Sequence, residues 1–175
     1  MENCEILELR QKRLLPTAVT YYRDPLQLTK AQGCKVWDNQ GKEYIDAIGG
    51  ILCITAGHNH PRIKKAIKEL LDGDFIQHTS VLYLTEWLPK VIDELCKYAP
   101  EGIEKGFMTN SGSEANELAV MAARQYTGRQ TVVALRHGYH GGTGVPLALC
   151  GHGTWRFKAS PNVGVVHAQA PNCYR

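Results

Sequence analysis

Residues 109–116 read TNSGSEAN and stand between an apolar segment, 106–108, and a helical pattern over 115–126. The apolar segment fits a buried parallel strand. Ser111 and Glu114 have the S-x-x-E spacing of a capping box, which predicts a helix start. The helix carries an apolar stripe that predicts close packing on a sheet, formed by Ala115, Leu118, Ala119, Ala122 and Ala123. Strand, tight turn and helix in this order are the repeating unit of an α/β fold.

The start of this helix is also a candidate anion site. Gly112 and Ser113 fall in the first turn, where backbone N–H groups lack intrahelical partners and the helix dipole is positive. Glycine allows an anion to approach the backbone, and the hydroxyls of Ser111 and Ser113 add donors. The sequence S-G-S-E at 111–114 is also typical of a capped helix that binds no ligand, so a second signal is needed to indicate an anion site.

The second signal is a glycine-rich turn, RHGYHGGT at 136–143, which follows a predicted strand at 131–135. In a right-handed βαβ unit the carboxyl ends of successive strands lie at one edge of the sheet, where ligands bind. We therefore expect Tyr139 to lie near the start of the helix at 111–113, which we call the phosphate turn. An aromatic ring beside an anion site suits a planar, phosphorylated ring.

The remaining elements are predicted from local patterns. Residues 35–46 predict a β-hairpin around the turn-rich centre 39–41. Apolar residues recur at helical spacing from Pro61 to Gly73 and again over 87–98. A further strand is expected at 163–167.

The order of these elements predicts an α/β protein. We expect an N-terminal segment with the hairpin at 1–60 and part of a larger domain at 61–175. The predicted sheet is small and unfinished, because no helix follows its last strand. Exposed sheet edges and uncovered apolar faces favour self-association, with a dimer as the minimum.

Composition narrows the class of protein. The chain has 175 residues, of which 43% are hydrophobic, and a formal net charge of +3, so we expect a globular protein without nucleic-acid partners. No apolar run is long enough to cross a membrane. The six cysteines are widely spaced and are expected to be reduced. Three glutamates among the first eight residues argue against a mitochondrial transit peptide and favour a cytoplasmic location, with a mitochondrial one as the alternative.

Other motifs have simpler interpretations. His58 and His60, or His137 and His140, lack acidic or cysteine partners at metal-ligand spacing, so we expect no metal site. The glycine-rich turn lacks the lysine and threonine of a P-loop and the G-x-G-x-x-G order of a dinucleotide site. The serines of N-S-G-S-E do not stand in a G-x-S-x-G nucleophile elbow.

Taken together, these motifs resemble one known family. NSGSEANELAVMAAR, followed by TGRQTVVALRHGYHG, is similar to the core of class III aminotransferases, which depend on pyridoxal 5'-phosphate (PLP). The resemblance extends upstream through VWDNQGKEYIDAIGGILCITAGHNHPRIKKAI and is strongest to the alanine-glyoxylate type 2 branch. It implies an incomplete PLP-transferase large domain of the aspartate aminotransferase-like kind, preceded by a small-domain segment.

The resemblance also implies roles for particular residues. It assigns the cofactor phosphate to Ser111, Gly112 and Ser113, stacking on the pyridine ring to Tyr139, and a supporting role beside the ring to His140. On the substrate side, it places Gly50 and Ile51 in a loop that helps to choose the amino donor. Residues 78–83 resemble a segment that reaches toward a partner subunit, which implies a homodimer.

Two parts of the family's chemistry find no match in this sequence. An aminotransferase needs a lysine that binds the cofactor covalently and an acid that keeps the pyridine nitrogen protonated. Neither the family's Asp-Glu-x-Gln run nor its lysine motif occurs here. We expect a fragment of an enzyme that transfers an amino group from an amino acid to a keto acid, inactive alone. The alternatives are half of a split enzyme completed by another chain, and a cofactor-free interaction or oligomerisation protein.

Overall fold

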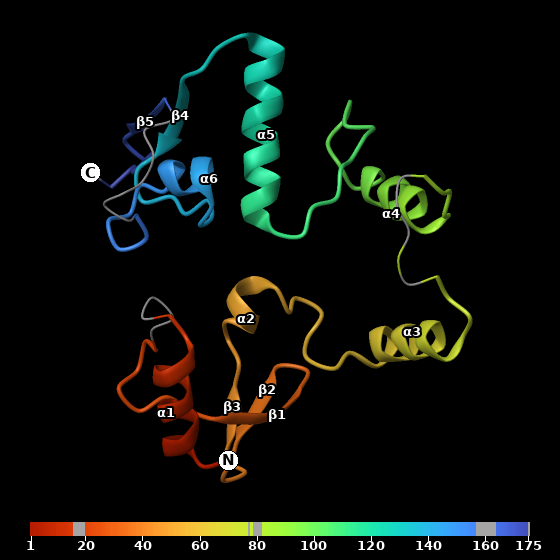
Figure 1. The fold of residues 1–175 in the computed structure, drawn as a ribbon, viewed down its shortest axis with the longest axis vertical. Helices are drawn as coiled ribbons and strands as arrows, with labels where there is room; N and C mark the ends of the chain where they lie inside the picture. The colour runs from red at the N-terminus through yellow and green to blue at the C-terminus, as the bar shows by residue number, and fades with distance from the viewer. Residues whose placement is uncertain (16–19, 77, 79–81, 157–163, 175) are drawn as a thin grey trace. The chain divides into compact units, whose positions relative to one another are not determined.

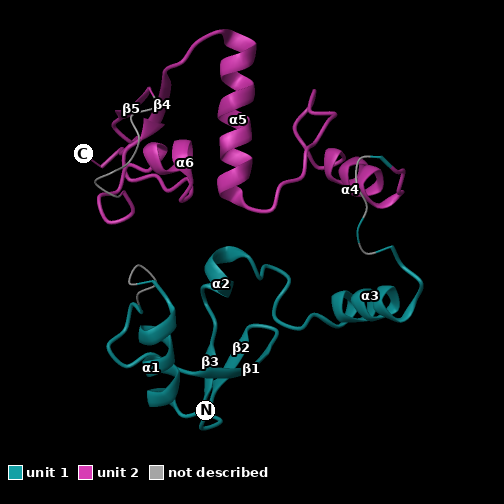
Figure 2. Cartoon of the chain, viewed as in Figure 1, with its two compact units in different colours: residues 1–82 teal, residues 83–175 magenta. Residues whose placement is uncertain are grey.

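The computed structural model describes residues 1–15, 20–76, 78, 82–156 and 164–174. The chain forms two compact units, Met1–Leu82 and Tyr83–Arg175 (Figure 2). The domain boundary predicted between residues 60 and 61 stays a prediction.

The first unit contains a three-stranded antiparallel sheet. Its strands β1 (Leu28–Gln32), β2 (Lys35–Asp38) and β3 (Glu43–Ile45) lie in the order β1-β2-β3 (Figure 1). The hairpin predicted over 35–46 is confirmed as the β2–β3 pair. The strand β1 and the N-terminal helix α1 (Asn3–Arg13) were not predicted.

The carboxylate of Asp38 holds the hairpin turn together. Its Oδ1 accepts the backbone N–H groups of Gln40 and Lys42, both at 2.9 Å, and its Oδ2 accepts the hydroxyl of Tyr44 at 2.8 Å. Burial raises the pKa of Asp38, but these hydrogen bonds outweigh burial, and the net pKa is lowered. An ionised, fully hydrogen-bonded carboxylate therefore sets this turn.

Two further helices lie where the sequence predicted them, α3 (Pro61–Asp72) in the first unit and α4 (Trp87–Cys96) in the second. The helix α3 begins at the predicted proline and ends before Gly73, and α4 occupies the second helical pattern. Both helices are amphipathic, yet their apolar residues are largely exposed, including Ile63, Ile67, Leu71, Leu88, Val91 and Leu95. Between β3 and α3 lies α2 (Gly49–Leu52), a single left-handed turn.

The second unit has the predicted alternation around a parallel pair of strands. The helix α5 (Gly112–Thr127) is followed by β4 (Val132–Leu135), the short helix α6 (Gly144–Leu149) and β5 (Val165–Ala168). The strands β4 and β5 pair in parallel, with Val132 opposite Val165. The strand predicted at 131–135 is confirmed within one residue, and so is the described part of the strand predicted at 163–167, whose residue 163 lies outside the described residues. The helix α6 was not predicted.

The strand predicted at 106–108 is wrong. These residues are not in a strand, and Phe107 is 77% exposed. The physical reason is that a strand is defined by pairing, and among the described residues no strand lies beside this segment.

The predicted packing of the α5 stripe on a sheet is also not observed. Ala115, Ala119, Ala122 and Ala123 are exposed, and Leu118 is half-buried. It is α6, not α5, that packs on β5, and α5 packs on α6 instead. The opposite, more polar face of α5 is therefore the one that positions the candidate site.

The described core is small. The buried apolar side chains are Val36 in the first unit and Ala134, Pro146, Ala148, Leu149 and Cys150 in the second. The Nε2 atom of His167 on β5 lies 3.1 Å from the carbonyl oxygen of Leu149, which ties the end of α6 to the sheet. No described helix combines the length and apolar character needed to span a bilayer.

Candidate functional site

The predicted capping box forms only in part at the start of α5, because the carboxylate of Glu114 bonds the N–H of Asn110 and not that of the N-cap residue. Ser111 is the N-cap in an extended conformation, and its hydroxyl accepts the backbone N–H of Glu114 at 3.1 Å. The carboxylate of Glu114 in turn accepts the N–H of Asn110 at 2.7 Å. In a helix that begins at Gly112, the N–H groups of Gly112 and Ser113 have no intrahelical acceptor. They are the donors that remain for an external anion.

The glycine-rich turn lies directly against this helix start. The N–H of Gly142 donates to the Oγ of Ser113 at 3.1 Å. At Gly141 the backbone has a φ of 125°, and a Cβ there would lie 2.3 Å from the same oxygen. Only glycine permits both the conformation and the contact. The two predicted turns, separated by a helix and a strand in sequence, are thus in direct contact.

A second contact holds the residues beside Tyr139. The side-chain amide of Asn116 donates to the carbonyl oxygen of His140 at 2.8 Å. Tyr139 is 62% exposed, and its ring meets that of Trp155 edge to face, with centroids 5.5 Å apart. His140, the neighbour of Tyr139 in sequence, thus contacts α5 near its start, and the predicted position of the Tyr139 ring beside the phosphate turn stays a prediction. Neither Asn116 nor Trp155 was assigned a role from sequence, because their partners lie far away along the chain.

The side chain of His140 has a ring nitrogen that makes no hydrogen bond within the described residues. This atom, Nε2, is buried. The ring lies against Gly138, where a Cβ would be only 2.7 Å from Nε2. A buried ring nitrogen without a partner is costly, so a polar ligand group that reached it would be stabilised.

These features fit a phosphorylated planar ring. A Cβ at Gly112 would meet nothing within 4 Å, so the space in front of the first turn is open. The Oγ of Ser113 accepts a hydrogen bond from Gly142 and keeps its own hydrogen for donation to an anion. The exposed ring of Tyr139 offers a flat apolar face in the same unit.

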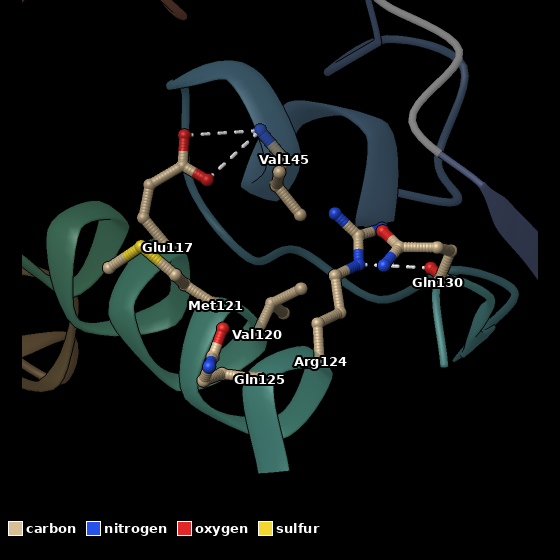
Figure 3. Close-up of a pocket in the computed structure, with 7 residues that line it drawn as sticks. All are labelled: Glu117, Val120, Met121, Arg124, Gln125, Gln130 and Val145. Carbon is tan, nitrogen blue, oxygen red and sulfur yellow. Dashed lines mark hydrogen bonds between the residues drawn. The ribbon is translucent and has the colours of Figure 1, made fainter. Parts of the chain in front are cut away.

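An open pocket of about 410 Å³ lies farther along α5 (Figure 3). Both carboxylate oxygens of Glu117 accept the N–H of Val145 at 3.2 Å, and the Nε of Arg124 donates to the carbonyl oxygen of Gln130 at 2.9 Å. The pocket is lined by Glu117, Val120, Met121, Arg124, Gln125, Gln130 and Val145. It contains none of the predicted phosphate-binding residues, and its charged groups already join α5 to α6 and to the loop before β4.

The predicted substrate-side residues belong to the first unit. Gly50 and Ile51 lie in the left-handed turn α2, where Gly49, Gly50, Ile51 and Leu52 have φ values between 54° and 65°. A β-branched residue rarely adopts this conformation, so the surrounding structure must stabilise it. Ile51 is 77% exposed.

The carboxylate of Asp46 stabilises this turn. Its Oδ1 accepts the N–H groups of Ile48 at 3.1 Å and Gly49 at 2.9 Å, and its Oδ2 lies 2.7 Å from the Nε2 of His58. The hydrogen bond with His58, followed by those from Gly49 and Ile48, lowers the pKa of Asp46. His58 therefore has a carboxylate partner, which sequence reasoning missed because the two residues lie on either side of the turn.

No group of three potential ligands for a metal ion occurs in the part of the chain that the structure describes. The side chain of His58 is engaged by Asp46. The ring of His137 lies edge to face against that of His152, with centroids 6.1 Å apart.

The comparisons with known proteins agree with the fold and the motifs. The sequence profile of the aminotransferase class-III family matches residues 17–174, so the chain belongs to this family. It is 36% identical over 170 residues to an Arabidopsis thaliana protein, alanine–glyoxylate aminotransferase 2 homolog 2, mitochondrial, and the match covers 97% of this chain and 35% of that protein. It is 37% identical over 137 residues to the acetylornithine aminotransferase of Methanopyrus kandleri, covering 78% of this chain and 34% of the relative.

The solved structure of an aminotransferase also aligns with nearly the whole of this chain. The chain aligns with taurine:2-oxoglutarate aminotransferase from Bifidobacterium kashiwanohense, determined in complex with PLP and glutamate, at a TM-score of 0.83 and 28% identity. The alignment covers 99% of this chain and 39% of that one. The 175 residues therefore span about a third of the length of the curated relatives that they match.

We predict that Gly141→Ala disrupts the contact between the two turns. The new Cβ would overlap the Oγ of Ser113, and alanine disfavours the positive φ, so we expect a loss of about 1–3 kcal/mol in unfolding free energy. Thermal unfolding followed by circular dichroism measures this loss. Gly142→Ala is the matched control, because a Cβ there meets nothing within 4 Å and the N–H is retained. Equal stability of the two variants would contradict the observed packing.

We predict that Asp46→Ala lowers the unfolding midpoint at neutral pH. The pKa of Asp46 is lowered in the folded state, so its stabilisation is complete above the ordinary value of 3.8 and is lost as the pH falls through the folded-state pKa. The difference between parent and variant should therefore shrink in acid, as measured by unfolding midpoints across pH. Asp74→Ala, at an exposed aspartate, serves as the control. A pH-independent difference would show that the charge of Asp46 does not hold the turn.

Proposed function

We propose that this chain supplies the phosphate-binding and ring-binding part of a PLP-dependent class III aminotransferase. The observation that supports it best is the contact of the glycine-rich turn with Ser113 at the start of α5. This contact leaves the N–H groups of Gly112 and Ser113 and one hydroxyl hydrogen facing an open space. Such a cluster of donors at a helix N-terminus suits the phosphate of PLP.

The residues of this chain would hold and orient the cofactor. Ser111, Gly112 and Ser113 would bind its phosphate, and Tyr139 would stack on its ring. His140 would support that arrangement through its buried Nε2, which lacks a partner among the described residues. When bound, PLP supplies an electron sink for chemistry at the α-carbon of an amino acid. Everything assigned to this chain concerns binding and orientation.

The proposed reaction is transfer of an amino group from an amino acid to a keto acid. Ile51 would face the substrate with Gly50 beside it, and its apolar side chain offers no polar group for a distal amine or carboxylate. The relatives act on different donors by name, alanine in one case and acetylornithine in another. Within this range, an apolar residue at position 51 favours a donor without a charged group at the far end of its side chain.

The covalent chemistry would come from outside these residues. The family's lysine motif and its Asp-Glu-x-Gln motif do not occur in the 175 residues. We therefore expect these residues alone to bind the cofactor without turnover. In the assembled enzyme, the lysine and the acid would complete the site.

The proposed assembly is a homodimer. Residues 78–83 carry the resemblance to a partner-facing segment, although 79–81 lie outside the described residues. The apolar faces of α3 and α4 are exposed and need a cover, which supports assembly. For its place in the cell, we propose the cytoplasm, with the mitochondrion, which the name of the Arabidopsis relative gives, as the alternative.

The first test is a titration of the purified chain with PLP, followed by borohydride reduction and mass spectrometry. We expect saturable binding without a specific covalent adduct, since the matching lysine motif is absent. One specifically labelled lysine would overturn the proposed division of labour. Absence of binding would favour a cofactor-free interaction protein over the proposed function.

We predict that Gly112→Asp weakens PLP binding by at least about tenfold, because a carboxylate would stand beside the phosphate. The matched control is Gly112→Asn, which has the same size without the charge. Binding is measured by fluorescence titration with PLP and with pyridoxal, which lacks the phosphate. An aspartate in the first helical turn stabilises the helix, so unfolding stability should not fall with affinity. Equal PLP affinity of the aspartate and asparagine variants would rule out this site.

A further inference from the structure

Cys150 is the most buried cysteine of the described chain and lies directly after α6. Its side chain is fully buried, and its Sγ has three backbone neighbours. The Sγ accepts the N–H of His140 at 3.3 Å. As a donor, it lies 3.4 Å from the carbonyl oxygen of Gly141 and 3.3 Å from that of Pro146. A thiol is a weak donor and a weak acceptor, so its effect here depends on the combination of contacts.

Two of these contacts act on the turn that touches the phosphate site. The stretch 140–142 is held at four backbone atoms. The Sγ of Cys150 accepts the N–H of His140 and donates to the carbonyl oxygen of Gly141. From α5, Asn116 donates to the carbonyl oxygen of His140, and the Oγ of Ser113 accepts the N–H of Gly142. The turn is thus held between α5 on one side and the thiol on the other.

The orientation of Ser113 depends on this arrangement. Its Oγ accepts from Gly142 at 3.1 Å, which directs the hydroxyl hydrogen away from the turn and leaves it available to an anion. Loss of the support beneath Gly141 would let the turn move away. Ser113 would then lose the hydrogen bond that fixes its rotamer.

Cys150 is itself held in place from both ends. Glu117 accepts the N–H of Val145 in the first turn of α6, as the dashed lines in Figure 3 show. After the thiol, the N–H of Gly151 donates to the carbonyl of Gly138 at 3.0 Å, and a Cβ at Gly151 would lie 2.9 Å from the Cα of Arg136. The thiol is therefore a fixed point against which the turn packs.

We propose that Cys150 is a positioning residue for the phosphate site, acting through the backbone of residues 140–142 on Ser113. This inference rests on the proposed function and adds a residue to it that no sequence motif identifies. The thiol itself does not touch the cofactor. Full burial also excludes a role as an exposed nucleophile.

The test compares PLP binding by the full chain and its variants. Cys150→Ala removes all three polar contacts and should weaken PLP affinity by about fivefold or more. Cys150→Ser keeps a donor and an acceptor in a smaller group and should recover part of the loss. The affinity for inorganic phosphate, measured by competition, should fall in proportion to the affinity for PLP. The affinity for pyridoxal should change little, because pyridoxal lacks the phosphate.

Leu149→Ala separates positioning from general stability. Leu149 is a buried neighbour on α6, and its truncation should lower the unfolding midpoint at least as much as Cys150→Ala. We expect it to leave PLP affinity within about twofold of the parent. Equal weakening by Leu149→Ala, or unchanged affinity in Cys150→Ala, would overturn the inference.

The two proposals fail in different ways. If the parent chain binds no PLP, the proposed function fails, and this inference fails with it as a statement about the cofactor. If the parent binds PLP and Cys150→Ala binds equally well, only the inference fails.

Hydrogen exchange of the His140 and Gly142 amides adds a ligand-free readout. Both amides should exchange faster in Cys150→Ala than in Leu149→Ala, and equal exchange rates would contradict the proposed contacts.

Discussion

The close approach of Gly141 to Ser113 is the constraint on which the second unit depends. A backbone without a side chain, held at a positive φ, lets the turn after β4 touch the start of α5. The hydrogen bond from Gly142 to Ser113 and that from Asn116 to His140 then become possible. Because these contacts join two turns at neighbouring strand and helix ends, they collect the donors that suit a phosphate at one place. The chemistry proposed for this chain follows from that packing.

The described structure forms its turns and caps more completely than its core. Carboxylates fix the tight turns, as Asp38 does in the hairpin and Asp46 does before α2. Helix faces, by contrast, stay exposed, and few apolar side chains are buried. This contrast is expected of residues that span about a third of their relatives' length, since capping and turn hydrogen bonds are local whereas burial needs facing elements.

The same difference between local and distant interactions explains which elements could be predicted. The hairpin at 35–46 has turn residues, α3 a proline at its start, α4 apolar residues at helical spacing and α5 the S-x-x-E pattern, so their signals lie in the sequence. The segment 106–108 was wrongly predicted as a strand, because its apolar character says nothing about a partner strand. The helix α6 escaped prediction because its first turn is capped by the distant Glu117.

For the candidate site, the sequence by itself determined the family, the phosphate turn, the glycine-rich turn and the residues expected to bind the cofactor phosphate. These features depend on short-range spacing, which a linear sequence records. Only the tertiary structure decided that Gly141 rests on Ser113, that Asp46 meets His58, and that the thiol of Cys150 lies beneath the turn. Each of these contacts joins residues whose separation along the chain carries no signal, because packing and hydrogen bonding depend on distance in space.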